Sequence, residues 1–122
     1  MEMGGKTGRS KLTNKNLQTL FRNLNKDFFN NEICSRGLEI RFGTNKECRG
    51  CYGISSWDGE LLINECLQRM ALFVTQTMLH EMAHTKLIQK GYIGYTTYGG
   101  HQLLFYAELN RLYIAGAFEG LL

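Results

Sequence analysis

The pentapeptide His80-Glu81-Met82-Ala83-His84 constrains this chain more than any other part of its sequence. Residues four positions apart project from the same face of an α-helix, so both imidazoles can reach one metal ion if this segment is helical. Glu81 lies beside them along the helix surface and can contact a water held by that metal. The pattern therefore predicts a zinc site with a carboxylate base next to it.

The residues around the pentapeptide favour a helix. Neither Gly nor Pro occurs between about Ala71 and Lys90, which predicts a helix over that range. Apolar residues surround the two imidazoles on nearly every side, so we expect a buried helix whose polar groups serve a metal. These apolar residues are Leu72, Phe73, Val74, Met78, Leu79, Met82, Leu87 and Ile88.

A catalytic zinc site usually has three protein ligands and keeps the fourth position for water. We expect His101 to be the third ligand, with Glu108 and Cys66 as the alternatives. The short-range HExxHxxGxxH pattern is excluded, because Leu87 and Lys90 occupy its Gly and last His positions. His101 opens a second helical pattern, and Gly99-Gly100 before it allow a tight turn. Its face is expected to hold Leu104, Phe105, Glu108 and Leu112.

The N-terminal half predicts a helix followed by a small sheet. Thr13 or Asn14 can cap a helix that Asn30-Asn31 would end. Its apolar stripe is Leu17, Leu20, Phe21, Leu24 and Phe28. Residues 38–42 alternate apolar and charged side chains, and residues 52–57 and 60–64 form two further strands around an Asp58-Gly59 turn. We therefore predict an α+β, zincin-like single domain with a three-stranded antiparallel or mixed sheet, the HExxH helix and a C-terminal helix.

The chain resembles the SprT-like family of zinc metallopeptidases, which is related to the Spartan proteases. The resemblance rests on His80-Glu81-Met82-Ala83-His84, on His101 with Phe105 four residues later, and on Gly53 and the segment 61–64 upstream. It implies that His80, His84 and His101 bind Zn²⁺ and that Glu81 is catalytic. Gln102 replaces a Gly that is typical of the family, and no C-terminal zinc ribbon follows before Leu122. The resemblance also implies substrates among DNA-associated proteins.

Composition and charge limit the partners. The 122 residues, 43% of them hydrophobic, fit one domain over 12–122, with 1–11 as a disordered or tag-like N-terminus. We find neither a membrane-spanning segment nor a secretory signal, and expect an intracellular monomer, cytoplasmic or, in a eukaryote, nuclear. Residues 1–50 carry a net charge of +5 and residues 51–122 a net charge of −2. The basic half could attract nucleic acid, but we favour a solvated helix face formed by Lys11, Lys15, Arg22 and Lys26.

The four cysteines do not form a recognisable zinc-binding pattern. Cys48 and Cys51 make one CxxC pair, whereas Cys34 and Cys66 lie far from it on either side. A four-cysteine zinc site usually shows two close pairs. We interpret these residues as reduced thiols, with a redox or second metal site and disulfides as the alternatives.

The predicted chemistry is hydrolysis of a peptide bond in a polypeptide substrate. Glu81 would take a proton from a zinc-activated water and pass it to the leaving amine. Tyr98 is our candidate donor to the developing oxyanion, although packing over the site is the simpler role for it. Two other functions stay open. One is a zinc-binding or DNA-associated module without turnover, and the other is a deformylase-like or amidase-like hydrolase.

Overall fold

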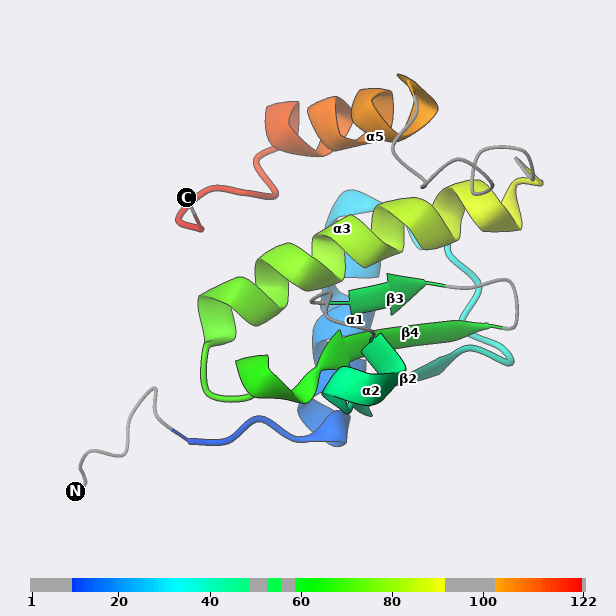
Figure 1. Ribbon diagram of the computed structural model, residues 1–122. Helices are drawn as coiled ribbons and strands as arrows, with labels where there is room; N and C mark the ends of the chain where they lie inside the picture. Colours follow the sequence, from blue (N-terminus) through cyan, green and yellow to red (C-terminus); the bar gives the residue numbers. More distant parts are fainter. Residues whose placement is uncertain (1–9, 49–52, 56–58, 92–102, 122) are drawn as a thin grey trace.

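The computed structural model describes residues 10–48, 53–55, 59–91 and 103–121 (Figure 1). Helices and strands both occur in this part of the chain, which confirms the α+β class. In chain order they are α1 (Asn14–Phe28), β2 (Glu39–Gly43), α2 (Asn45–Cys48), β3 (Gly53–Ser55), β4 (Glu60–Asn64), η1 (Glu65–Leu67), α3 (Ala71–Gln89) and α5 (Leu103–Ile114). Nearly all of the predicted N-terminal tail, residues 1–9, lies outside the described residues. None of the described helices is long and apolar enough to cross a membrane.

The ends of α1 follow from polar side chains that the sequence places there. Thr13, one of the two predicted caps, accepts a hydrogen bond from the backbone of Asn16 at 3.1 Å and donates its own backbone N–H to the Asn16 side chain at 2.9 Å. This reciprocal pair satisfies two amides that a helix start leaves unpaired. Asn30 and Asn31 have φ of 54° and 58°, a left-handed conformation that Asn tolerates, and they end the helix as predicted.

The sheet has the order β2-β4-β3, in which β4 pairs in parallel with β2 and antiparallel with β3. Alternation along the strands sends Ile40, Phe42, Leu61 and Ile63 into the main core, while Arg41 pairs with Leu62 between them. The alternating segment predicted at 38–42 is a strand at 39–43, one residue later. Of the strand predicted at 52–57, residues 53–55 are confirmed; residues 52, 56 and 57 lie outside the described part.

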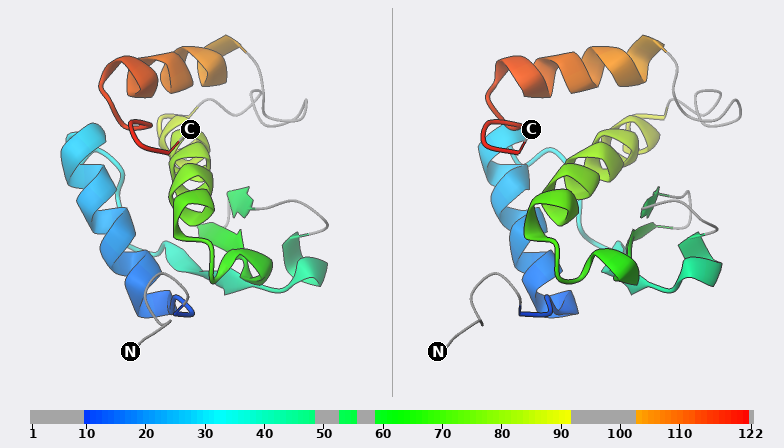
Figure 2. Two further views of the ribbon diagram at one scale, coloured as in Figure 1. Left: turned by 90° about the vertical axis from the view of Figure 1, so that its left-hand side faces the viewer. Right: turned by 60° about the vertical axis from the view of Figure 1, so that its left-hand side comes forward.

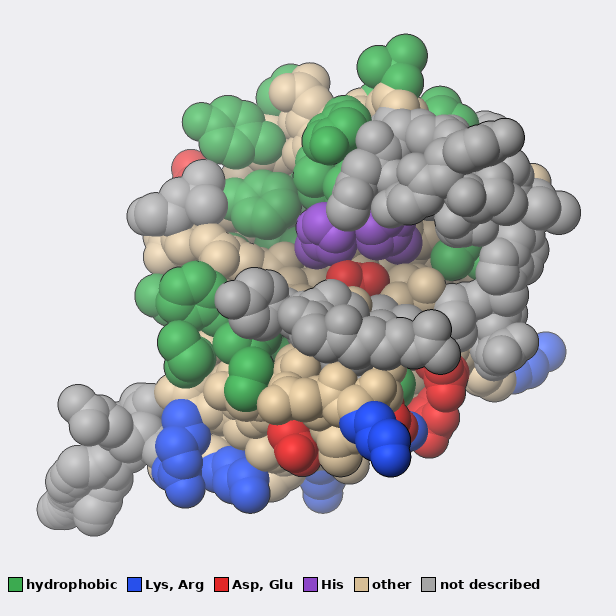
Figure 3. Space-filling model, viewed as in Figure 1, with side chains coloured by type: hydrophobic (Ala, Val, Ile, Leu, Met, Phe, Trp, Pro, Cys, Tyr) green, Lys and Arg blue, Asp and Glu red, His purple; other side chains and the backbone are tan. Residues whose placement is uncertain are grey.

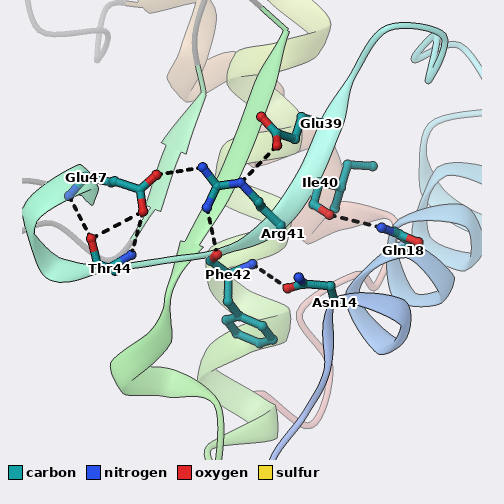
Figure 4. A network of polar contacts seen from close by, with 8 residues as sticks. All are labelled: Asn14, Gln18, Glu39, Ile40, Arg41, Phe42, Thr44 and Glu47. Atoms are coloured by element: carbon teal, nitrogen blue, oxygen red, sulfur yellow. Dashed lines mark hydrogen bonds and ion pairs between the residues drawn. The ribbon is translucent and has the colours of Figure 1, made fainter.

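Side chains of α1 cover the outer edge of β2 (Figure 4). The backbone N–H of Phe42 donates to Asn14 Oδ1 at 2.9 Å, and Gln18 donates to the carbonyl of Ile40 at 3.3 Å. An exposed strand edge can pair with other chains, and these contacts occupy it. On the sheet surface, Arg41 binds Glu39 at 3.0 Å and Glu47 of α2 at 2.6 Å. The opposite edge of the sheet is formed by β3.

Helices α1 and α3 lie on the same side of the sheet, and α5 crosses over the ends of both (Figure 2). The core between them is made by apolar residues from every layer. Its fully buried large members are Phe21, Phe29, Phe105, Leu17, Leu61, Ile63, Met78, Leu79, Met82, Leu112 and Val74. Helix α3 ends one residue before the predicted limit. The expectation that apolar residues bury it throughout was wrong at its start, where Leu72 and Phe73 are more than half exposed at 57% and 53%.

Candidate active site

Helix α3 carries His80 and His84 on one face, one turn apart. Their ring centroids lie 5.0 Å from each other, with the ring planes at 66°. His80 keeps 39% of its side chain exposed, whereas His84 is buried. Histidine side chains are visible at the surface of the molecule (Figure 3). The helical spacing thus brings the two imidazoles together as predicted, and solvent can reach the His80 ring.

Glu81 lies next to this pair but is almost fully buried, with 6% of its surface exposed. Its Oε2 is 4.0 Å from Nε2 of His80. Burial disfavours the ionised carboxylate and raises the pKa of Glu81 to about 8. A carboxyl group with a pKa near neutrality can both accept and return a proton at physiological pH. At pH 7 this carboxyl is mostly protonated without a metal, so its position suits a general base once a nearby cation favours the ionised form.

Strand β3 packs against the side of α3 that carries Glu81. A β-carbon added at Gly53 would lie 2.8 Å from Cγ of Glu81 and 2.9 Å from Cγ2 of Thr77. Only glycine allows this close approach of strand and helix. Two residues along the strand, the Ser55 hydroxyl contacts the Thr85 hydroxyl at 2.6 Å. Because Thr85 donates its proton to the carbonyl of Glu81 at 2.9 Å, Ser55 is the donor to Thr85.

The Phe105 side chain of helix α5 packs against the two imidazoles. The Phe105 ring stacks on the His84 ring, with centroids 4.1 Å apart and planes at 12°, and it meets His80 edge-on at 4.8 Å. Phe105 is fully buried. Of the four residues predicted to share a helix face with His101, Phe105, Glu108 and Leu112 are buried and Leu104 is 43% exposed, while His101 lies outside the described residues. The Leu104 side chain lies one position away from the buried stripe.

Glu108, an alternative ligand in the sequence, has other partners. Its carboxylate accepts hydrogen bonds from Lys86 at 3.0 and 3.2 Å and from Arg111 Nη2 at 2.6 Å. Burial alone would raise the pKa of Glu108, but the hydrogen bonds from Arg111 and Lys86 outweigh it and lower that pKa below its ordinary value. The carboxylate is thus buried and ionised in an ion-pair cluster.

The family model for the SprT-like family matches residues 17–112, which is most of the chain. The chain belongs to the SprT-like family. The match includes the HExxH segment of α3, the three strands and most of α5. Neither the curated proteins nor the solved structures compared with the chain gave a match. Membership in the SprT-like family agrees with the resemblance seen in the sequence.

Other predicted site residues fall partly outside the described structure. His101, Tyr98 and Cys51 are among residues that the structure does not describe, and so is the side chain of Cys48. Cys34 and Cys66 are free and exposed thiols. Cys66 lies in η1, before α3, and the ten residues from Ala71 to His80 span about 14 Å of helix. Within the described ranges, no three His, Cys, Asp or Glu side chains form a metal-binding group.

The described residues could supply part of the coordination sphere of a zinc ion. Two imidazoles on one helix face are the nitrogen donors that zinc prefers. The buried carboxyl of Glu81 beside them has its pKa raised by desolvation, and a nearby cation would favour its ionised form. The donor set and the carboxyl therefore fit a divalent cation at this position.

Two contributors to the site had only weak signals in the sequence. Gly53 was noticed as part of the family resemblance, but its contact with Glu81 joins residues that are 28 positions apart. Lys86, which holds Glu108, could be read as one more exposed charge on α3. Its position two residues after His84, in a segment that is otherwise buried, was the available hint.

Proposed function

We propose that this SprT-like protein is a zinc-dependent metallopeptidase that hydrolyses peptide bonds in polypeptides. The observation that carries the proposal is the position of Glu81, a buried carboxyl one residue from His80 and on the same turn as the His80–His84 pair. Family membership supports the same chemistry. In this proposal His80, His84 and His101 hold the zinc ion, and His101 remains a prediction from the sequence.

The chemical roles follow from the groups that line the site. Zinc, when bound, acidifies a water molecule and polarises the scissile carbonyl. Glu81 accepts a proton from the attacking water and later donates it to the leaving amine, so the carboxyl returns to its starting state. Ser55 and Thr85 hold the backbone of this helical turn against β3, and Gly53 leaves the Glu81 side chain its space. Tyr98 stays our candidate donor to the oxyanion.

The sheet favours an extended polypeptide as the substrate. Strand β3 is the edge strand of the described sheet and packs on the flank of α3 that carries Glu81. An extended peptide can add to such an edge through main-chain hydrogen bonds, which place successive peptide bonds beside a fixed point. We infer that the substrate chain lies along β3 with its scissile bond near Glu81 and the imidazoles.

DNA-associated proteins remain a proposal for the natural substrates. The basic residues of the N-terminal half are exposed, including Lys15, Arg22 and Lys26 on α1. This exposure supports the interpretation of a solvated helix face and leaves these charges accessible to an acidic surface. A salt-dependent increase of proteolysis on adding DNA would support the nucleic-acid role.

The metal site is tested by measuring bound zinc in the purified wild type and in the variants His80→Ala, His84→Ala and His101→Ala. We expect about one zinc per chain in the wild type and a large loss in each variant, because three ligands are needed for a tight site. Gln102→Ala, next to the proposed third ligand, is the matched control and should keep its zinc. Full zinc retention in His101→Ala would contradict the proposed ligand set.

A further inference from the structure

Glu108 is the centre of an ion-pair cluster in which Lys86 and Glu108 are shielded from water, while Glu32 and Arg111 are 43% and 42% exposed. Lys86 Nζ lies 3.0 Å from Glu108 Oε1, and Arg111 Nη2 lies 2.6 Å from Glu108 Oε2. The side chains of Lys86 and Glu108 are only 12% and 8% exposed. An ion pair removed from water to this degree has a high desolvation cost. Its attraction offsets that cost only when the two side chains keep good hydrogen-bonding geometry.

The cluster joins three segments that are far apart in the sequence. Lys86 of α3 also contacts Glu32, in the segment after α1, at 3.4 Å. The guanidinium of Arg111 lies over the ring of Phe29, the C-cap residue of α1, at 5.4 Å from its centroid. These contacts lie where α5 crosses the ends of α1 and α3 (Figure 2). They hold α5 at one position on the rest of the domain.

The same face of α5 reaches the imidazoles one turn earlier. Phe105 lies three residues before Glu108, and both are buried against α3. Because the Phe105 ring stacks on His84 at 4.1 Å and meets His80 at 4.8 Å, neither imidazole can turn freely while α5 stays in place. The position of α5 therefore limits the orientation of both rings. The groups that orient metal-binding imidazoles contribute strongly to metal affinity.

We propose that Lys86 and Glu108 are positioning residues of the metal site, which hold α5 on α3 so that Phe105 fixes the rings of His80 and His84. The proposal rests on the proposed function, because it assumes that these imidazoles bind zinc. It differs from a ligand role for Glu108, in which the carboxylate itself would bind the metal. It also differs from a purely structural ion pair, which would change stability and leave zinc affinity unchanged.

The test compares Glu108→Gln and Lys86→Met with wild type in three measurements. These are the zinc dissociation constant, the zinc content at saturation and the visible absorption spectrum of the Co²⁺-substituted protein. We expect both variants to bind zinc about tenfold more weakly, to retain about one zinc per chain at saturation, and to show a changed Co²⁺ spectrum. Lys86→Arg, which keeps the charge, should restore most of the affinity.

Glu47→Gln is the matched control, because it removes a carboxylate from another ion pair, the 2.6 Å contact with Arg41. Its zinc affinity and Co²⁺ spectrum should equal those of wild type. If Glu108→Gln does not fold, the comparison of Lys86→Met with Lys86→Arg carries the test.

Three results would overturn the proposal. Unchanged zinc affinity and an unchanged spectrum in Lys86→Met would show that the cluster has only a structural role. Loss of zinc stoichiometry in Glu108→Gln but not in Lys86→Met would make Glu108 a ligand. A wild-type protein that binds no zinc would overturn the proposed function and this inference together, whereas the first two results leave the proposed function standing.

Discussion

Gly53 of β3 and Glu81 of α3 approach so closely that a β-carbon at position 53 would lie 2.8 Å from Cγ of Glu81. Real β-carbons essentially never make such a contact with another carbon, so any other residue forces the carboxyl, the strand or the helix to shift. The side chain of Glu81, the general base of the proposed reaction, thus has room at this position because residue 53 has no side chain. This relationship connects the sheet to the chemistry of the HExxH helix.

Gly53→Ala should impair catalysis more than folding. The added methyl group must displace the Glu81 side chain, and a misplacement of about 1 Å can lower a rate by about 100-fold. We expect a fall in kcat of roughly tenfold or more, measured on an unfolded protein substrate, with zinc content unchanged. Gly37→Ala is the control, because Gly37 has a φ of 77° and nothing within 4 Å of an added β-carbon. That variant should lose some stability and keep its kcat.

The burial of Glu81 predicts a pH dependence of stability in the metal-free protein. Burial raises the pKa of Glu81 in the folded protein to about 8, from an ordinary value of 4.5. Between these two pH values the folded state keeps the proton and the unfolded state loses it, so rising pH favours unfolding. The free energy of unfolding of wild type should therefore fall, relative to Glu81→Gln, as pH rises from about 4.5 to about 8. Above pH 8 the difference should level off. Urea unfolding at a series of pH values, with a chelator present, measures this difference.

Added zinc should reduce or abolish the effect of Glu81 on the pH dependence of stability. A bound cation stabilises the ionised carboxylate, so the loss of stability with rising pH should shrink or disappear when the site is loaded. A metal-free difference between wild type and Glu81→Gln that is flat from pH 4.5 to 8 would contradict the environment described for this carboxyl. An unchanged slope with zinc bound would mean that Glu81 lies away from the metal.

Asn25 should be important for stability but not for chemistry. Its buried side chain donates to the carbonyl of Ile33 at 3.0 Å and accepts from the N–H of Ile33 at 3.3 Å, which holds the segment after α1. Asn25→Ala leaves both backbone groups of Ile33 without this partner. We expect a loss of about 1–3 kcal/mol in the free energy of unfolding. Asn23→Ala, at an exposed position of the same helix, should change it by less than about 0.5 kcal/mol.

The elements that could be predicted from the sequence are those set by local patterns. Helix α3 was bounded to within one residue at its end, because a long apolar segment without Gly or Pro has few other ways to fold. The cap at Thr13 and the stop at Asn30-Asn31 are likewise local. Helix α2 and η1 were not predicted, since four and three residues are too few to show a helical period.

The parts of the site that could not be predicted depend on which elements pack together. Periodicity placed Phe105 and Glu108 on one face of a helix, but it could not tell that this face meets His84 and Lys86. For the same reason, apolar Leu72 and Phe73 were taken as buried, although no described segment covers them enough to exclude water. The sequence predicts which residues form the candidate site, and the packing of β3 and α5 decides how the described ones are held.

The most direct test of the central claim is cleavage of an unfolded protein substrate by zinc-loaded wild type and by Glu81→Gln, with zinc content measured in the same samples. We expect cleavage by wild type and a loss of at least about 100-fold in Glu81→Gln, with the zinc content unchanged. Cleavage at the wild-type rate by zinc-loaded Glu81→Gln would contradict the role of Glu81. No cleavage by zinc-loaded wild type would contradict the peptidase itself.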